Sequence, residues 1–121
     1  MIKGQCLCGV VQYQYHGEIE NSILCYCSDC QQAQGSIAGW NSPIEQSKFE
    51  LISGQEQLKE YFHTPNKARV FCQNCASPVY SYRKDLPDVI RLRLGTVTEG
   101  VIPAPKEEFF LEHKPKFIEL R

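Results

Sequence analysis

Two stretches of the chain alternate between apolar and polar residues. In residues 11–15, a valine and two tyrosines fall on one face of an extended chain and two glutamines fall on the other. In residues 88–95, an isoleucine and two leucines point inward, while Arg91 and Arg93 point outward to solvent. This period of two predicts half-buried β-strands. Other short apolar segments predict strands at residues 48–54, 68–72, 77–83 and 116–120.

Helical patterns are scarce. Ser28 can cap a short helical turn that runs through SDCQQAQ and stops at Gly35. Residues 55–62 fit either a helical turn or a strand, and the proline-rich residues 100–108 predict an exposed loop. The pattern therefore predicts a mainly β protein with little helix. A length of 121 residues suits a single domain that covers residues 1–121.

The charge balance argues against two classes of partner. The chain has 13 basic and 14 acidic residues and a net charge of −1, so neither nucleic acid nor an anionic membrane surface is an expected partner. No apolar run approaches the roughly 18 residues of a membrane span. The opening MIKGQCLCG lacks the apolar region of a secretory signal. We therefore expect a cytoplasmic protein, whose thiols stay reduced.

Cysteine is unusually frequent, with seven residues in three clusters. Because the number is odd, disulfides alone cannot use them all. Structural zinc sites take four ligands, commonly all cysteine. The C-x-C pair Cys6 and Cys8 places both sulfurs on one side of an extended chain, and a turn does the same for Cys72 and Cys75. These four cysteines predict a closed structural zinc site that joins the N-terminus to residue 75.

The middle cluster, CYCSDC, is left with three ligands: Cys25, Cys27 and Cys30. Three protein ligands with a free fourth position are typical of catalytic zinc. The spacing therefore favours a second, open zinc site. We expect two zinc ions per chain, the second more easily lost than the first. An open site of this kind can bind an incoming thiol and deprotonate it.

Other interpretations of the cysteines stay open on the sequence alone. A histidine could close the second site, although none of the three histidines has ligand spacing to the cluster. A disulfide between Cys30 and either Cys25 or Cys27, or a thiol cluster without metal, would also fit. An iron–sulfur cluster would need four cysteines at other spacings. For the first site, the alternative is a pair of unrelated buried cysteines.

Three motifs together resemble the glutathione-dependent formaldehyde-activating enzyme family, also called the Gfa or CENP-V family. They are G-x-C-x-C-G at residues 4–9, C-x-C-x-x-C at residues 25–30 and F-C-x-x-C at residues 71–75. QGS at residues 34–36 and LGTV at residues 94–97 add support. One departure is Ala76, where the family usually has glycine. A positive φ at this position would strain alanine.

The resemblance implies an Mss4-like fold of several small, coiled antiparallel sheets. It implies a catalytic zinc at the middle cluster and a structural zinc at Cys6, Cys8, Cys72 and Cys75. It also implies a carbon–sulfur lyase that condenses formaldehyde with glutathione to S-hydroxymethylglutathione. The expected partner is then a small thiol, glutathione in the family. The chain departs from the family in its C-terminal part, so the resemblance assigns no glutathione-binding residues.

Two functions compete at this point. The first is a zinc-dependent enzyme that acts on a small thiol or on its aldehyde adduct. The second is a non-catalytic zinc-binding interaction module, or a thiol and redox sensor, on the same scaffold, because fold alone does not determine function. The middle cluster favours the enzyme, since a scaffold needs only the four cysteines of the closed site.

Substrate contacts are weakly marked in the sequence. Ser36 and Trp40 follow the middle cluster and are candidates to line its pocket. Three strand arginines are candidates to bind carboxylates: Arg69, Arg91 and Arg93. The simpler interpretation makes Trp40 a half-buried packing residue and the arginines solvated side chains.

Overall fold

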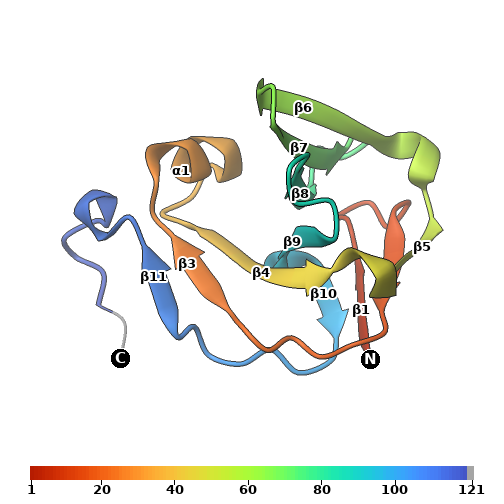
Figure 1. Ribbon diagram of the computed structural model, residues 1–121, viewed down its shortest axis with the longest axis horizontal. Helices are drawn as coiled ribbons and strands as arrows, with labels where there is room; N and C mark the ends of the chain where they lie inside the picture. Colours follow the sequence, from red (N-terminus) through yellow and green to blue (C-terminus); the bar gives the residue numbers. More distant parts are fainter. Residues whose placement is uncertain (120–121) are drawn as a thin grey trace.

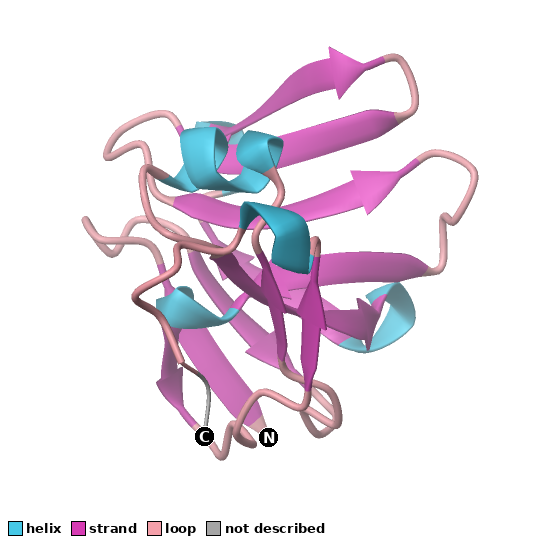
Figure 2. Cartoon of the chain, turned by 90° about the vertical axis from the view of Figure 1, so that its left-hand side faces the viewer, coloured by secondary structure: helices cyan, strands magenta, loops and turns pink. Residues whose placement is uncertain are grey.

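Strands form most of the structure, a computed structural model that describes residues 1–119. The strands are β1 (Ile2–Gln5), β2 (Gln12–Tyr15), β3 (Ile23–Cys25), β4 (Gly39–Glu45), β5 (Phe49–Ser53), β6 (Leu58–Thr64), β7 (Lys67–Cys72), β8 (Pro78–Arg83), β9 (Val89–Arg93), β10 (Val97–Glu99) and β11 (Glu107–Phe109). The helical elements are α1 (Ser28–Gln34) and 3₁₀ turns at Gln46–Lys48, Gln55–Gln57, Leu94–Thr96 and Leu111–His113. The prediction of a mainly β fold is confirmed (Figure 1, Figure 2). No described helix is long and apolar enough to cross a membrane.

The alternating segments became strands where the pattern predicts them, in β2, β5, β7, β8 and β9. Residues 55–62 combine a 3₁₀ turn with the first part of β6. Residues 116–119 form no strand, so that prediction is wrong for them, and residue 120 lies outside the described residues.

The first sheet has the strand order β10-β1-β2-β5 and is antiparallel. Its inner face carries the apolar side of residues 11–15, where Tyr13 and Tyr15 are buried. The ring of Tyr13 packs against Phe49 of the neighbouring strand, with centroids 5.1 Å apart. The alternation of β2 therefore decides which face of this sheet meets the core.

The second sheet has the strand order β11-β3-β4-β9-β8-β7-β6. Its described pairs are antiparallel apart from β11 and β3, which run parallel with Phe109 opposite Cys25. The two strands lie side by side at the left of Figure 1. The loop expected over residues 100–108 is therefore wrong for Glu107 and Glu108. This pairing brings a late part of the chain beside the middle cysteine cluster.

The main core lies between the two sheets. Ile2 and Tyr13 come from the first sheet, and Ile44, Val79 and Leu92 come from the second. Each of these side chains is at most 4% exposed. Only one face of the second sheet is used in this core, so its opposite face is available for a functional site.

Candidate metal sites and the basic cavity

Four sulfur atoms from distant parts of the chain converge at one point. The Sγ atoms of Cys6, Cys8, Cys72 and Cys75 all lie within 4.8 Å of one another. The Cys6–Cys8 distance is 3.5 Å and the Cys8–Cys72 distance is 3.9 Å. Zinc–sulfur bonds of about 2.3 Å would place the sulfurs of a tetrahedral site about 3.8 Å apart. The geometry therefore fits a zinc ion, and we call this group the four-cysteine site.

Turns bring these cysteines together. Cys6 and Cys8 lie in a turn after β1, in which the backbone N–H of Gly9 donates to the carbonyl of Cys6. The extended chain expected for this pair is therefore wrong, although both sulfurs reach the same point. Cys72 ends β7, and its carbonyl accepts a hydrogen bond of 2.7 Å from the backbone N–H of Ala76.

The sulfurs of this site differ in how readily they lose a proton. Burial raises the pKa of the Cys72 thiol to about 11. Burial acts in the same sense on Cys75, but hydrogen bonds, above all with Ser77, outweigh it and lower the pKa to about 5. The backbone N–H of Val11 donates to the Sγ of Cys6 at 3.3 Å. The Cys75 sulfur is thus prepared for the deprotonated state that zinc requires.

Ala76 follows the last of these cysteines in a left-handed backbone conformation, with φ of 67°. This is the strain expected for alanine at that position, and it costs about 1 kcal/mol or more relative to glycine. We expect Ala76→Gly to raise the free energy of unfolding by up to about 1 kcal/mol, because relief of strain exceeds the entropy cost of glycine.

Thermal denaturation of the zinc-loaded protein measures this change. The matched control is Ala68→Gly in the buried interior of β7, where glycine should lower the melting temperature. A melting temperature that falls equally in both variants would contradict strain at Ala76.

A second group of sulfurs consists of Cys25, Cys27 and Cys30, again within 4.8 Å of one another. Cys25 ends β3, while Cys27 caps α1 and Cys30 lies in its first turn. The Sγ atoms of Cys25 and Cys30 are 3.4 Å apart, and the backbone N–H of Cys30 donates to the Sγ of Cys27 at 3.2 Å. Ser28 is thus not the cap. Within residues 1–119 no fourth ligand joins this group, which we call the three-cysteine site.

The thiols of the three-cysteine site interact with each other and with Arg69. All of them are free cysteines. Burial raises the pKa of Cys25 to about 12. Burial also acts against ionisation of Cys30, but hydrogen bonds with Cys27, Cys25 and Arg69 outweigh it, and the pKa of Cys30 is lowered. Arg69 therefore serves as a counter-charge for the Cys30 thiolate.

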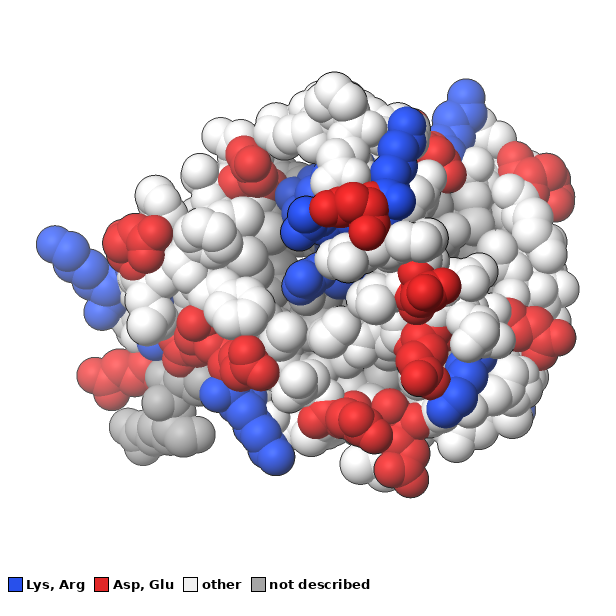
Figure 3. All heavy atoms as spheres, in the orientation of Figure 1, with Lys and Arg blue, Asp and Glu red and all other residues white. Residues whose placement is uncertain are grey.

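A cavity of about 570 Å³ adjoins the three-cysteine site, a volume in the range of small-ligand pockets. Its walls include all three of these cysteines, residues of α1, β7, β8 and β9, and the segment after β11. Its cationic lining consists of Lys67, Arg83, Arg91 and Arg93. Figure 3 shows basic side chains gathered in a hollow, with acidic side chains around it. We call this cavity the basic cavity.

The arginines of β7 and β9 are not simple solvated side chains, and for Arg93 that interpretation is wrong. Arg93 is 5% exposed, and residues of α1 and of the segment after β11 line the same cavity. Its guanidinium donates to the Oγ of Ser81 and to the carbonyl of Arg91, both at 3.1 Å. Burial lowers the pKa of Arg93 to about 10. The Nη1 atom of Arg69 is buried without a hydrogen-bond partner among the described residues.

Two cationic lining residues, Lys67 and Arg83, were missed from the sequence. A signal was present, because Lys67 precedes Arg69 by two positions and so shares its face of the strand. The candidates Ser36 and Trp40 lie outside the lining of the basic cavity. The indole Nε1–H of Trp40 instead donates to Ser22 Oγ at 2.7 Å, which supports its packing role.

A second cavity of about 440 Å³ shares Asp29 and Arg93 with the basic cavity. Tyr61, His63 and Tyr80 contribute to its walls, and its described lining contains no cysteine. The basic cavity therefore has the stronger case as a reaction site, because the sulfurs of the three-cysteine site open onto it.

Comparison with known proteins agrees with this architecture. A model of the glutathione-dependent formaldehyde-activating enzyme family matches residues 1–113. A crystal structure of a protein from Rhodobacter sphaeroides shares the fold, with a TM-score of 0.68 and 24% identity over 88% of this chain and 98% of that chain. A search of curated proteins found no match. Because the family match spans nearly the whole sequence, the chain belongs to the glutathione-dependent formaldehyde-activating enzyme family.

Proposed function

We propose that the protein forms and breaks the carbon–sulfur bond between a small thiol and formaldehyde, as an S-(hydroxymethyl)glutathione synthase does. The observation that carries this proposal is the three-cysteine site, whose sulfurs lie in the wall of the basic cavity. A purely structural zinc protein would need only the four-cysteine site. Family membership supports glutathione as the thiol.

The three-cysteine site fits zinc in both geometry and donor type. The 3.4 Å between the sulfurs of Cys25 and Cys30 is close to the spacing of about 3.8 Å in a tetrahedral zinc site. Thiolate sulfur is a donor that zinc accepts readily. Three ligands leave one corner free, and the cavity gives a ligand access to these sulfurs. When bound, zinc would supply Lewis acidity that favours the thiolate form of a coordinated thiol.

The surrounding residues balance charge and hold the reactants. In the reaction the carbon–sulfur bond forms, the carbonyl π bond breaks, and the thiol proton ends on the new hydroxyl oxygen, so no oxidant or reductant is needed. Arg69 and Arg93 place positive charge near the sulfurs, where negative charge collects. Phe109 and Phe110 add apolar surface to the same cavity. The reaction needs reduced thiols, so we propose a cytoplasmic location.

Purified protein is expected to contain two zinc ions per chain, one of which a mild chelator removes first. Three ligands beside an open cavity should hold zinc less firmly than four ligands of which Cys6 and Cys72 are buried. Metal analysis and mass spectrometry after alkylation measure this, with the three-cysteine site labelled before the four-cysteine site. A single zinc together with unhindered alkylation of the three-cysteine site would instead favour a thiol sensor.

NMR exchange spectroscopy on formaldehyde and glutathione tests the activity. The zinc-loaded protein should accelerate the exchange of free formaldehyde and glutathione with S-hydroxymethylglutathione. Protein that has lost only the zinc of the three-cysteine site should not. Exchange at the uncatalysed rate with both zinc ions bound would overturn the proposal in favour of a non-catalytic interaction module.

A further inference from the structure

One face of the second sheet collects cations from three neighbouring strands. Residues two apart on a strand share a face, which places Lys67 with Arg69 on β7. The register sets Arg83 opposite Lys67, and it sets Ser81 between Arg69 and Arg91. Arg93, which is buried at the end of β9, belongs to the same region because it also lines the basic cavity.

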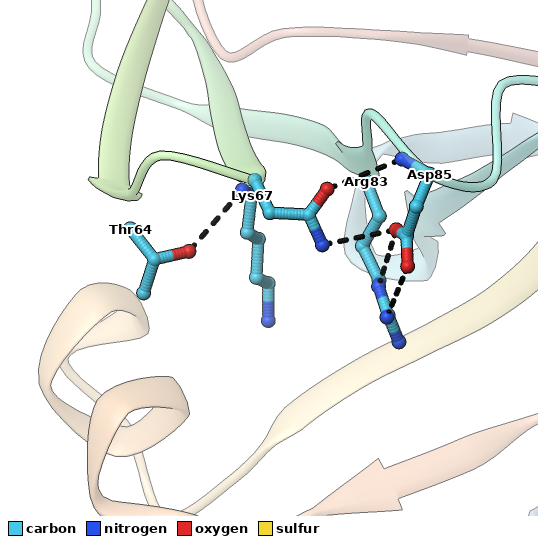
Figure 4. A network of polar contacts seen from close by, with 5 residues as sticks. Thr64, Lys67, Arg83 and Asp85 are labelled. Atoms are coloured by element: carbon cyan, nitrogen blue, oxygen red, sulfur yellow. Dashed lines mark hydrogen bonds and ion pairs between the residues drawn. The ribbon is translucent and has the colours of Figure 1, made fainter.

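The pairing of Lys67 with Arg83 is unfavourable for folding by itself. Like charges directly opposite each other on adjacent strands destabilise a sheet. Figure 4 shows that the two side chains extend in the same direction, toward the side of α1 and β4. Arg83 is compensated, because its Nη2 lies 2.7 Å from Asp85. The amine of Lys67 makes no hydrogen bond or ion pair with the other residues drawn in Figure 4.

Two other cations of the basic cavity, Lys67 and Arg91, have no carboxylate partner of this kind in the described part of the chain. Asp29 is the only carboxylate among the described lining residues, and it lies 3.3 Å from His63. Within residues 1–119 no carboxylate lies at salt-bridge distance from Lys67 or Arg91. Both side chains are half-buried, and an unpaired charge in such a place is costly unless a ligand pairs with it.

We propose that Lys67 and Arg91 are the specificity-determining residues of the basic cavity and bind an anionic group carried by the thiol substrate. This inference rests on the proposed function for the identity of the ligand as a thiol. Arg83 is engaged by Asp85, and Arg93 donates to Ser81 and to a backbone carbonyl. Lys67 and Arg91 therefore remain to recognise the ligand, and a neutral thiol of similar size is a poor substrate.

The chemistry of the group is that of a carboxylate or a phosphate. Arginine presents a planar fork that matches either group with two hydrogen bonds, while lysine adds a point charge. A cavity of about 570 Å³ holds a small molecule with this group together with its thiol. Two probes separate the sources: S-methylglutathione, whose carboxylates are intact and whose thiol is blocked, and inorganic phosphate.

Isothermal titration calorimetry on the zinc-loaded protein measures binding of each probe without any reaction. We expect Lys67→Gln and Arg91→Gln each to weaken binding of S-methylglutathione by about ten- to a hundredfold, as for a charged hydrogen bond. The matched control is Lys84→Gln, which removes the same charge from a lysine that lies over the ring of Phe62, outside the cavity lining. Its affinity should be unchanged. The diethyl ester of S-methylglutathione should bind as weakly to wild type as the acid binds to the variants.

Thermal denaturation separates loss of binding from loss of folding. Lys67→Gln should melt no lower than wild type, because it removes the repulsion with Arg83. Equal binding by Lys67→Gln, Arg91→Gln and Lys84→Gln, or equal binding of acid and ester, overturns the proposal. If only inorganic phosphate binds, and its affinity falls in Lys67→Gln and Arg91→Gln, the two residues form a subsite for a phosphate group and not for a carboxylate. If the two variants bind S-methylglutathione more weakly but the protein does not accelerate formaldehyde exchange, the anion subsite is supported and the proposed reaction is contradicted.

Discussion

A Cys72→Ala variant is expected to lose its zinc at the four-cysteine site and, with it, its cooperative fold. Cys72 is fully buried where β7 ends, and its sulfur lies 3.9 Å from that of Cys8. Structural zinc contributes on the order of 10 kcal/mol to folding in small domains. Whole domains are stable by only about 5 to 15 kcal/mol, so this loss is comparable to the total. Circular dichroism during heating and zinc analysis of the same sample measure the effect.

The control for Cys72→Ala is Cys25→Ala, which also removes one cysteine sulfur but from the three-cysteine site. This variant should keep a cooperative transition and one zinc per chain. If Cys72→Ala melts cooperatively within a few degrees of wild type, the four-cysteine site is not the element that holds the fold.

A Cys27→Ser variant is expected to keep the fold and to lose at least about a hundredfold in formaldehyde–glutathione exchange. Weakening a metal site through residues behind its ligands already costs about ten- to a hundredfold, and loss of a ligand should cost more. Serine retains an oxygen that can accept from the backbone N–H of Cys30, as the sulfur does at 3.2 Å. The N-cap of α1 therefore survives, while the thiolate does not.

Comparison of Cys27→Ser with Cys27→Ala separates the two roles of this residue. The alanine variant should be less stable than the serine variant by about 1 kcal/mol, because it lacks the cap, yet both should be equally inactive. NMR exchange rates and melting temperatures, measured with zinc analysis of each variant, provide the comparison. A serine variant with near wild-type exchange would show that the reaction does not depend on the three-cysteine site.

The sequence predicted the grouping of the cysteines well because residue identity and spacing are local properties. C-x-C and C-x-x-C pairs fix which sulfurs can meet, and both groups occur in the structure with the expected members. The turn around Cys6 and Cys8 differs from the expected extended chain, but two sulfurs two residues apart can converge in either conformation. The positive φ at Ala76 was also anticipated, because glycine is the usual residue there in the family.

The strands beside the three-cysteine site were harder to predict. β4 lies inside the second sheet although it contains Pro43, a residue that normally argues against an interior strand. β3 is only three residues long, too short to show an alternation. Its partner β11 follows a proline-rich stretch, and parallel pairing across so long a separation leaves no local signal. Arg93 lies opposite Asn41 of β4, so its burial could not be predicted either.

The parallel pairing of β11 with β3 has a consequence for the order in which the protein matures. The cysteines of both sites precede β11 in the chain, so a ribosome completes both sets of ligands before it makes β11. Phe109, Phe110 and His113, which help to wall the basic cavity, emerge later. The nascent chain can therefore form the four-cysteine site while the three-cysteine site is still open to solvent and to competing metals. Closure of the basic cavity is a late event in biosynthesis.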